Sequence, residues 1–272
     1  MSDVTTRFAR QMETNRASWD RRTPVHVASR FYDVDAFRAG ACSLMPVELA
    51  LVGDVRGRSL LHLQCHFGQD TLSWARRGAR VCGLDLSEVA IDEARSLARS
   101  IGIEDARFVA SNVYDASRAL GGERFDVVYT SYGVLGWLPE LDPWAREIAA
   151  CLRPGGVLHV VEFHPILWML DFASGAIAYP YDSRGVAIEE TQKGTYADRD
   201  APIEVHDFGW NHSLGSILGS LQRAGLTIEH FEEHDTSPYD IFGPLGERVD
   251  GGYRLRSQGA RIPYLFALTA RA

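Results

Sequence analysis

An acidic residue, Asp85, directly follows the apolar run Val81–Leu84, which predicts a buried strand. The preceding apolar run, Leu60–Leu63, predicts a first strand, and a polar turn separates it from a helix expected over Thr71–Arg77. Strand, helix, strand and acid form one βαβ unit with a carboxylate at the tip of its second strand. Open α/β sheets bind ligands at such tips, and an acid there can accept hydrogen bonds from both hydroxyls of a ribose. The sequence therefore predicts a site for a cofactor that contains a nucleoside.

Three other residues are candidates for proton transfer or substrate contact: His164, His212 and Tyr132. His164 lies just past a predicted fifth strand, His212 at the start of a later helix, and Tyr132 beside Ser131 at the tip of a predicted fourth strand. An imidazole with a pKa near 6.5 suits proton transfer at neutral pH. The alternatives are a solvated helix terminus for His212 and hydroxyls that satisfy turn backbone for Ser131 and Tyr132. His26 and His66 are further candidates for a base, and an anionic acceptor would need none.

The turn after the first strand argues against a diphosphate-binding loop. A dinucleotide site needs the pattern G-x-G-x-x-G so that backbone can approach the pyrophosphate, and here Gly68 is the only glycine. Gln64, His66 and Phe67 occupy the other positions, and the chain has no G-x-x-x-x-G-K-[ST] motif. A nicotinamide oxidoreductase is therefore disfavoured.

The same unit resembles motifs I and II of the class I S-adenosylmethionine-dependent methyltransferases. In the family pattern an acid precedes G-x-G-x-G; here His62 stands at the acid, Gln64 and His66 at the first two glycines, and Gly68 at the last. Asp85 matches the acid that binds the ribose. The resemblance implies S-adenosylmethionine as the cofactor, with its methionine ammonium group contacted from elsewhere because the acid is missing. The side chains of Gln64 and His66 are expected to project into or beside the cleft.

Two later stretches strengthen the resemblance. Asn112 follows the predicted third strand, Arg107–Ala110, where the family holds adenine with a side-chain acceptor and the next backbone amide, here that of Val113. The alternative for Asn112 is an Asx-turn. The turn Arg153–Gly156 leads into the fifth strand as the family's L-x-P-G-G turn does. The residues expected to bind the cofactor are Trp19, His26, Tyr32, Gln64, Cys65, Gly68, Asp85, Leu86, Asn112, Val113 and Ser131.

The N-terminal 45 residues are expected to form a lid. Residues 1–14 are polar, which predicts partial disorder, and a short helix capped by Asn15 is expected to be interrupted by Pro24. The aromatic residues of this segment either dock it on the core or cover the cofactor, whose sulfonium an aromatic face attracts. A lid also excludes water from the transfer site.

The whole chain is predicted to form one α/β domain with a doubly wound sheet. The resemblance implies seven strands in the order 3-2-1-4-5-7-6 with the last strand antiparallel. Residues 57–164 form the expected cofactor-binding core, residues 165–209 an insertion with a hairpin over the site, and residues 210–272 the closing helix and strands. Asn211 is expected to cap that helix, and residues 232–256 to form a loop.

Composition limits the partners. The 272 residues carry a formal net charge of −8, which argues against a nucleic acid. The four cysteines have no C-x-x-C spacing, which predicts free thiols and a cytoplasmic protein. No apolar stretch suggests a membrane segment, and no ligand spacing predicts a metal site. A monomer or a homodimer is expected.

The predicted function is methyl transfer from S-adenosylmethionine to an oxygen, nitrogen or carbon atom of a small metabolite. Two alternative functions would use the same cofactor without methyl transfer to a metabolite. The first is an intramolecular reaction of S-adenosylmethionine itself, and the second is a binding protein that senses the cofactor without turnover.

Overall fold

A seven-stranded sheet forms the centre of the protein, in a computed structural model that describes residues 3–256 and 262–272. The strand order is β3-β2-β1-β4-β5-β11-β8, and β11 runs antiparallel to both of its neighbours. This order confirms the predicted 3-2-1-4-5-7-6. The strands are β1 (Ser59–Leu63), β2 (Arg80–Asp85), β3 (Arg107–Ala110), β4 (Phe125–Ser131), β5 (Leu152–Phe163), β8 (Thr227–His234) and β11 (Leu265–Arg271).

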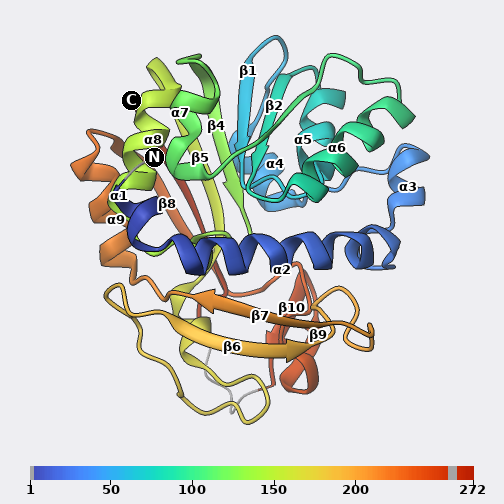
Figure 1. Cartoon of the computed structure of the whole chain (residues 1–272), viewed down its shortest axis with the longest axis vertical. Coiled ribbons are helices and arrows are strands. Elements are labelled where there is room, and N and C mark those ends of the chain that lie inside the picture. Colours follow the sequence, from blue (N-terminus) through green and yellow to red (C-terminus); the bar gives the residue numbers. More distant parts are fainter. Residues whose placement is uncertain (1–2, 257–261) are drawn as a thin grey trace.

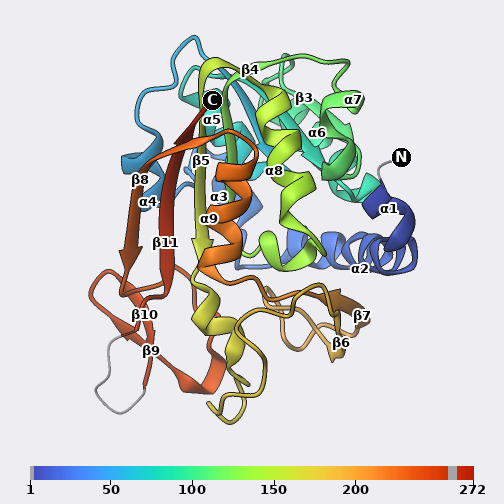
Figure 2. The same ribbon diagram turned by 90° about the vertical axis from the view of Figure 1, so that its left-hand side faces the viewer.

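Helices cover both faces of this sheet (Figure 1). Side chains alternate between the faces because successive residues of a strand point to opposite sides. Leu60 packs with Trp74 on the face of α4 and α5, whereas Leu61 packs with Trp144 on the face of α8 and α9. Figure 2 shows α8 and α9 side by side. The covering helices are α4 (Pro46–Val52), α5 (Gln69–Arg76), α6 (Glu88–Ser100), α7 (Ala116–Ala119), α8 (Leu141–Cys151) and α9 (Leu214–Arg223).

The N-terminal segment is helical, which corrects two expectations. Helices α1 (Asp3–Arg7) and α2 (Ala9–Ala28) fill the stretch expected to be partly disordered, of which Met1 and Ser2 lie outside the described residues. Pro24 does not interrupt α2, although proline removes one helical hydrogen bond. Its ring is exposed, and tertiary contacts of Arg22 and His26 hold the helix on both sides of it. A short helix, α3 (Val34–Arg38), follows.

Two antiparallel hairpins extend beyond the carboxyl ends of the parallel strands. The first, β6 (Ile188–Lys193) with β7 (Glu204–Gly209), lies in the insertion where a hairpin was predicted. The second, β9 (Gly246–Val249) with β10 (Gly252–Leu255), lies in residues predicted to be a loop. Ser213, rather than Asn211, caps α9, because its hydroxyl accepts the hydrogen bond from the amide of Ser216. Figures 1 and 2 show α2 crossing the ends of the strands, with β6 and β7 on its far side.

Within the described ranges, no helix is both long and apolar enough to cross a membrane.

Candidate active site

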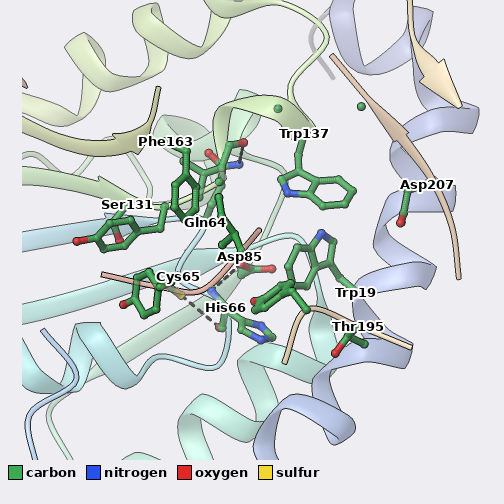
Figure 3. A pocket seen from close by; sticks show the side chains of 18 of the residues that line it. Trp19, Gln64, Cys65, His66, Asp85, Ser131, Trp137, Phe163, Thr195 and Asp207 are labelled. Atoms are coloured by element: carbon green, nitrogen blue, oxygen red, sulfur yellow. Dashed lines mark hydrogen bonds between the residues drawn. The ribbon is translucent and has the colours of Figure 1, made fainter. Parts of the chain in front are cut away.

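A cavity of about 1070 Å³ lies between the carboxyl ends of the parallel strands, α2 and the β6–β7 hairpin. Its lining includes every residue predicted to bind the cofactor except His26, together with Tyr132. Figure 3 shows Trp19 of α2 facing Trp137, which follows β4; their rings meet edge to face at 5.2 Å. The parallel strands therefore deliver their polar tips into one space, as this class of sheet requires.

The loop after β1 has the left-handed backbone conformation that glycine favours, although two of the three motif positions are not glycine. Gln64, His66 and Gly68 have φ angles of 56°, 50° and 79°, so all three positions of the motif are left-handed. A side chain in this conformation costs about 1–2 kcal/mol at each position. Such strain concentrates at functional sites, where the surrounding structure holds it. Both bulky side chains line the cavity, as predicted.

Asp85 is fixed by two backbone amides at the tip of β2. Its Oδ2 accepts a hydrogen bond from the amide of His66 at 2.8 Å, and its Oδ1 accepts one from the amide of Ser87 at 2.9 Å. Burial raises the pKa of Asp85 to about 6, although these amides oppose that shift. Each carboxylate oxygen keeps a lone pair for a further donor from the cavity.

Asn112 forms the Asx-turn that was the alternative to a ligand contact. Its Oδ1 accepts a hydrogen bond from the amide of Tyr114 at 3.1 Å, and its Nδ2 lies 3.0 Å from Sδ of Met12 on α2. The oxygen can accept a second hydrogen bond, and the side chain still lines the cavity. A turn role and a binding role are therefore compatible at this position.

Helix α2 is held on the hairpin by paired contacts. The side-chain amide of Asn15 donates to the carbonyl of Phe208 and accepts from its amide, both at 2.8 Å. About two helical turns after Asn15, the buried side chain of Arg22 forms a bidentate ion pair with Asp207 of β7. Arg22 lowers the pKa of Asp207, whereas burial raises it. Helix α2 and the β6–β7 hairpin are thus joined to each other where both line the cavity.

A histidine pair joins the same helix to the strained loop. His26 Nδ1 lies 2.9 Å from His66 Nε2, and the ring of His26 stacks on that of Tyr32. Burial lowers the pKa of His26 to about 3 and that of His66 well below its usual range. Both imidazoles are therefore neutral at physiological pH. His26 lies behind the cavity lining, whereas Trp19 and Tyr32 line it.

A buried glutamate organises the tip of β4. Glu162 Oε1 accepts hydrogen bonds from the amides of Gly133 and Phe163, and Oε2 accepts them from those of Val134 and Leu135. Burial nevertheless raises the pKa of this carboxyl. The four amides fix the turn that follows Ser131 and Tyr132, and both of these residues line the cavity.

The two histidines expected to face the crevice lie outside the cavity lining. His164 caps a short helix by accepting the amide of Ile166 on Nδ1, and its Nε2 lies 2.9 Å from Oε1 of Glu233. His212 bonds the carbonyl of Leu138 through Nε2 at 2.7 Å and is buried. His212 itself is buried, so the alternative of a solvated residue at the helix start is wrong.

Two carboxylates were missed by sequence reasoning. Glu48 of α4 accepts the hydroxyl of Tyr132 at 2.5 Å, and Asp70 at the start of α5 accepts the hydroxyl of Ser43 at 2.6 Å. Burial raises the pKa of Glu48 to about 7 and that of Asp70 to about 6. Glu48 is 84 residues from Tyr132, and its surrounding sequence gave no signal of this pairing.

Comparisons with known proteins agree with the fold. The family model described as a methyltransferase domain matches residues 61–158. A ubiquinone biosynthesis O-methyltransferase from Aeromonas salmonicida is 31% identical over 233 residues, which cover 84% of this chain and 89% of the relative. An uncharacterised methyltransferase from Synechocystis is 32% identical over 115 residues, 42% of this chain and 51% of the relative.

Solved structures show the same architecture. An S-adenosylmethionine-dependent methyltransferase from Mesorhizobium loti superimposes with a TM-score of 0.57 at 24% identity, covering 86% of this chain and all (100%) of that one. The seven-stranded order, the acid at the tip of β2 and the relative from Aeromonas all agree with the resemblance that the sequence suggested. This chain belongs to the class I S-adenosylmethionine-dependent methyltransferases.

Proposed function

We propose that this enzyme methylates a small metabolite that binds in the cavity between Tyr132 and the β6–β7 hairpin. The observation that carries the proposal is the size and lining of the cavity. Pockets of about 300–1,000 Å³ hold a drug-sized ligand, and this cavity of about 1070 Å³ runs from Asp85 and Asn112 to the insertion. That volume suits the cofactor and a second small molecule together.

The residues present fit S-adenosylmethionine. The carboxylate of Asp85 would accept both ribose hydroxyls, and Asn112 with the amide of Val113 would hold adenine. Gln64 supplies a replacement for the missing acid of the motif. Its Nε2 donates to the carbonyl of Val134 at 2.9 Å, whereas its Oε1 is buried without a hydrogen-bond partner. A methionine ammonium group would satisfy this oxygen, since leaving it unpaired costs about 1–3 kcal/mol.

An aromatic side chain of α2, that of Trp19, supplies a further contact. Trp19 and Trp137 both line the cavity with their rings edge to face, and a sulfonium bound against either ring would gain cation–π attraction. The bound cofactor supplies an electrophilic methyl group. The chain aligns an acceptor with that group and excludes water, which can lower the barrier by several kcal/mol.

Asp85→Ala tests the cofactor part of the proposal. Loss of the paired ribose contacts should weaken binding of S-adenosylhomocysteine by about 1–3 kcal/mol, or roughly 5- to 150-fold, in calorimetry. Asp92→Ala is the control, because Asp92 lies on the exposed face of α6 and pairs only with Arg95 among the ion pairs of the described residues. Equal affinity of the Asp85 variant and the control would reject the role given to Asp85.

Turnover with a panel of small metabolites tests the rest. Release of S-adenosylhomocysteine together with a methylated acceptor supports the proposal. Release of methylthioadenosine instead would favour an intramolecular reaction, and tight cofactor binding with no turnover across the panel would favour a sensor.

A further inference from the structure

The part of the cavity beyond the cofactor residues contains a buried phenol and carboxylate pair. Tyr132 lies at the tip of β4 with a left-handed φ of 50°, and its hydroxyl donates to Oε2 of Glu48 at 2.5 Å. Glu48 is fully buried, and its Oε1 has no hydrogen-bond partner. Tyr132 lines the cavity and Glu48 does not, so the Tyr132 side chain connects the cavity with the buried carboxylate of Glu48.

A second carboxylate lies beside this pair. Asp70 lines the cavity, bonds the hydroxyl of Ser43, and helps to raise the pKa of Glu48. In the described part of the chain neither acid has an ion pair, whereas Asp207 on the opposite wall is matched by Arg22. The local negative charge is thus left for a ligand to balance.

Aromatic rings complete the surroundings of Tyr132. Tyr239 meets its ring edge to face at 5.0 Å, Phe163 lies at 5.8 Å, and Phe31 contacts Tyr239 at 5.5 Å. Over the whole cavity, six carboxylate residues face two basic ones, Lys193 and Arg199. Aromatic faces and unpaired carboxylates together are the chemistry that recognises an ammonium ion.

We propose that the methyl acceptor is a basic amine that binds beside Tyr132, and that Glu48 receives its proton through the Tyr132 hydroxyl. This inference rests on the proposed function and names its substrate class and its proton acceptor. Tyr132 touches the amine; Glu48 acts through it.

The proton and electron balance is complete without another reactant. The ammonium passes a proton to Oη of Tyr132 while the phenolic proton moves to Oε2 of Glu48. The freed nitrogen lone pair then forms the N–C bond as the C–S bond breaks, and that bonding pair stays on sulfur. The products are a methylated ammonium ion, S-adenosylhomocysteine and one proton on Glu48, which returns to solvent.

The protonation states suit this path. Burial, followed by the charge of Asp70, raises the pKa of Glu48 to about 7, so the carboxylate can take up a proton near neutral pH. Burial raises the pKa of Tyr132, which keeps the phenol protonated before and after the transfer. The titratable groups that face Glu48 are Asp70 from α5, Tyr129 from β4, Tyr132 from the turn after β4, and Tyr239 from the segment after β8.

The first experiment measures binding without turnover. Enzyme saturated with S-adenosylhomocysteine is titrated at pH 8 with 2-phenylethylamine, the isosteric alcohol 2-phenylethanol, and 3-phenylpropionate. The amine should bind at least 10-fold more tightly than either, and Glu48→Gln should reduce that preference. Equal or tighter binding of the alcohol or the acid, or binding of none of the three, would overturn the inference.

The second experiment measures turnover of a panel of primary amines and their matched alcohols. Glu48→Gln keeps an acceptor for the phenol but cannot take a proton, so kcat should fall by about 100-fold or more. Wild-type kcat should rise with pH through about 7, where Glu48 loses its proton. This rising limb of the pH–rate profile (the pH limb) should vanish in Glu48→Gln and in Tyr132→Phe. Alcohol methylation without amine methylation, or an unchanged limb in both variants, would refute the relay.

A matched control is present at the mouth of the same cavity. The hydroxyl of Tyr179 donates to Oε1 of Glu190 at 2.7 Å, which is the same pair of groups on exposed side chains. Tyr179→Phe and Glu190→Gln should keep the rise of kcat with pH, although both residues line the cavity and loss of the Glu190 charge should weaken amine binding. Wild-type binding of S-adenosylhomocysteine separates the two levels of the proposal: its absence rejects the cofactor site, whereas its presence with no amine preference rejects this inference alone.

Discussion

Glu162→Gln tests whether one buried carboxylate holds the turn that presents Tyr132. Each oxygen of Glu162 accepts two backbone amides, so in either orientation a glutamine NH₂ group would face two N–H donors. The loss of about two charge-assisted hydrogen bonds removes about 3–6 kcal/mol. Burial raises the pKa of Glu162, which means that the buried charge is itself unfavourable. Replacing it with a neutral glutamine therefore offsets part of the free energy lost with the hydrogen bonds. We expect a net loss of about 2–4 kcal/mol in the free energy of unfolding.

Urea denaturation followed by circular dichroism would measure this loss. Glu147→Gln is the matched control, because Glu147 accepts one backbone amide, that of Ser117 at 2.7 Å, and a glutamine oxygen can replace it. We expect the control to lie within about 1 kcal/mol of wild type. A Glu162→Gln protein as stable as the control would show that the four amides do not hold this turn.

Three other perturbations follow from buried charges. Arg22→Met leaves Asp207 buried without its partner and should cost about 3–5 kcal/mol in urea unfolding, whereas loss of the exposed pair in Arg223→Met should cost less than about 1 kcal/mol; equal costs would contradict the structure. The pKa of Glu48 rises from 4.5 to about 7 on folding, so wild type loses stability as pH rises between these values, and Glu48→Gln should gain about 3 kcal/mol relative to wild type from pH 4.5 to 7.5. His26 has a pKa lowered from 6.5 to about 3, so its contribution to stability is lost as pH falls below 6.5; His26→Phe should remove about 1.4 kcal/mol per pH unit from that decline, and parallel pH curves would refute the assignment.

The sheet and the polar residues at its strand tips could be predicted because their signals are local. A short apolar run predicts a buried strand, and Ser87 follows Asp85 as the expected cap of α6, where its hydroxyl accepts the amide of Ala90. The resemblance supplied the strand order, which spacing alone leaves open. The residues at the tips of β1 to β4 followed from that order.

The unbroken course of α2 and the pairing of Glu48 with Tyr132 could not be predicted, because contacts between residues far apart in the sequence define them. Helix α2 continues through Pro24, since Asn15 and Arg22 bind residues of β7 more than 180 positions away. Histidine chemistry suggested His164 as a base, but its neighbour Glu233 and its capping role appear only in the folded chain. Glu162 showed no motif, because its four partners are backbone amides.

The double hydrogen bond between Asn15 and Phe208 has a consequence for the catalytic cycle. The Asn15 side chain bonds the backbone of Phe208 as a neighbouring strand would, so α2 and β7 can separate only if both hydrogen bonds break. Under the proposed function, joint displacement of α2 and the hairpin would open the cofactor side and the acceptor side of the cavity together. Cofactor exchange and product release would then share one opening step.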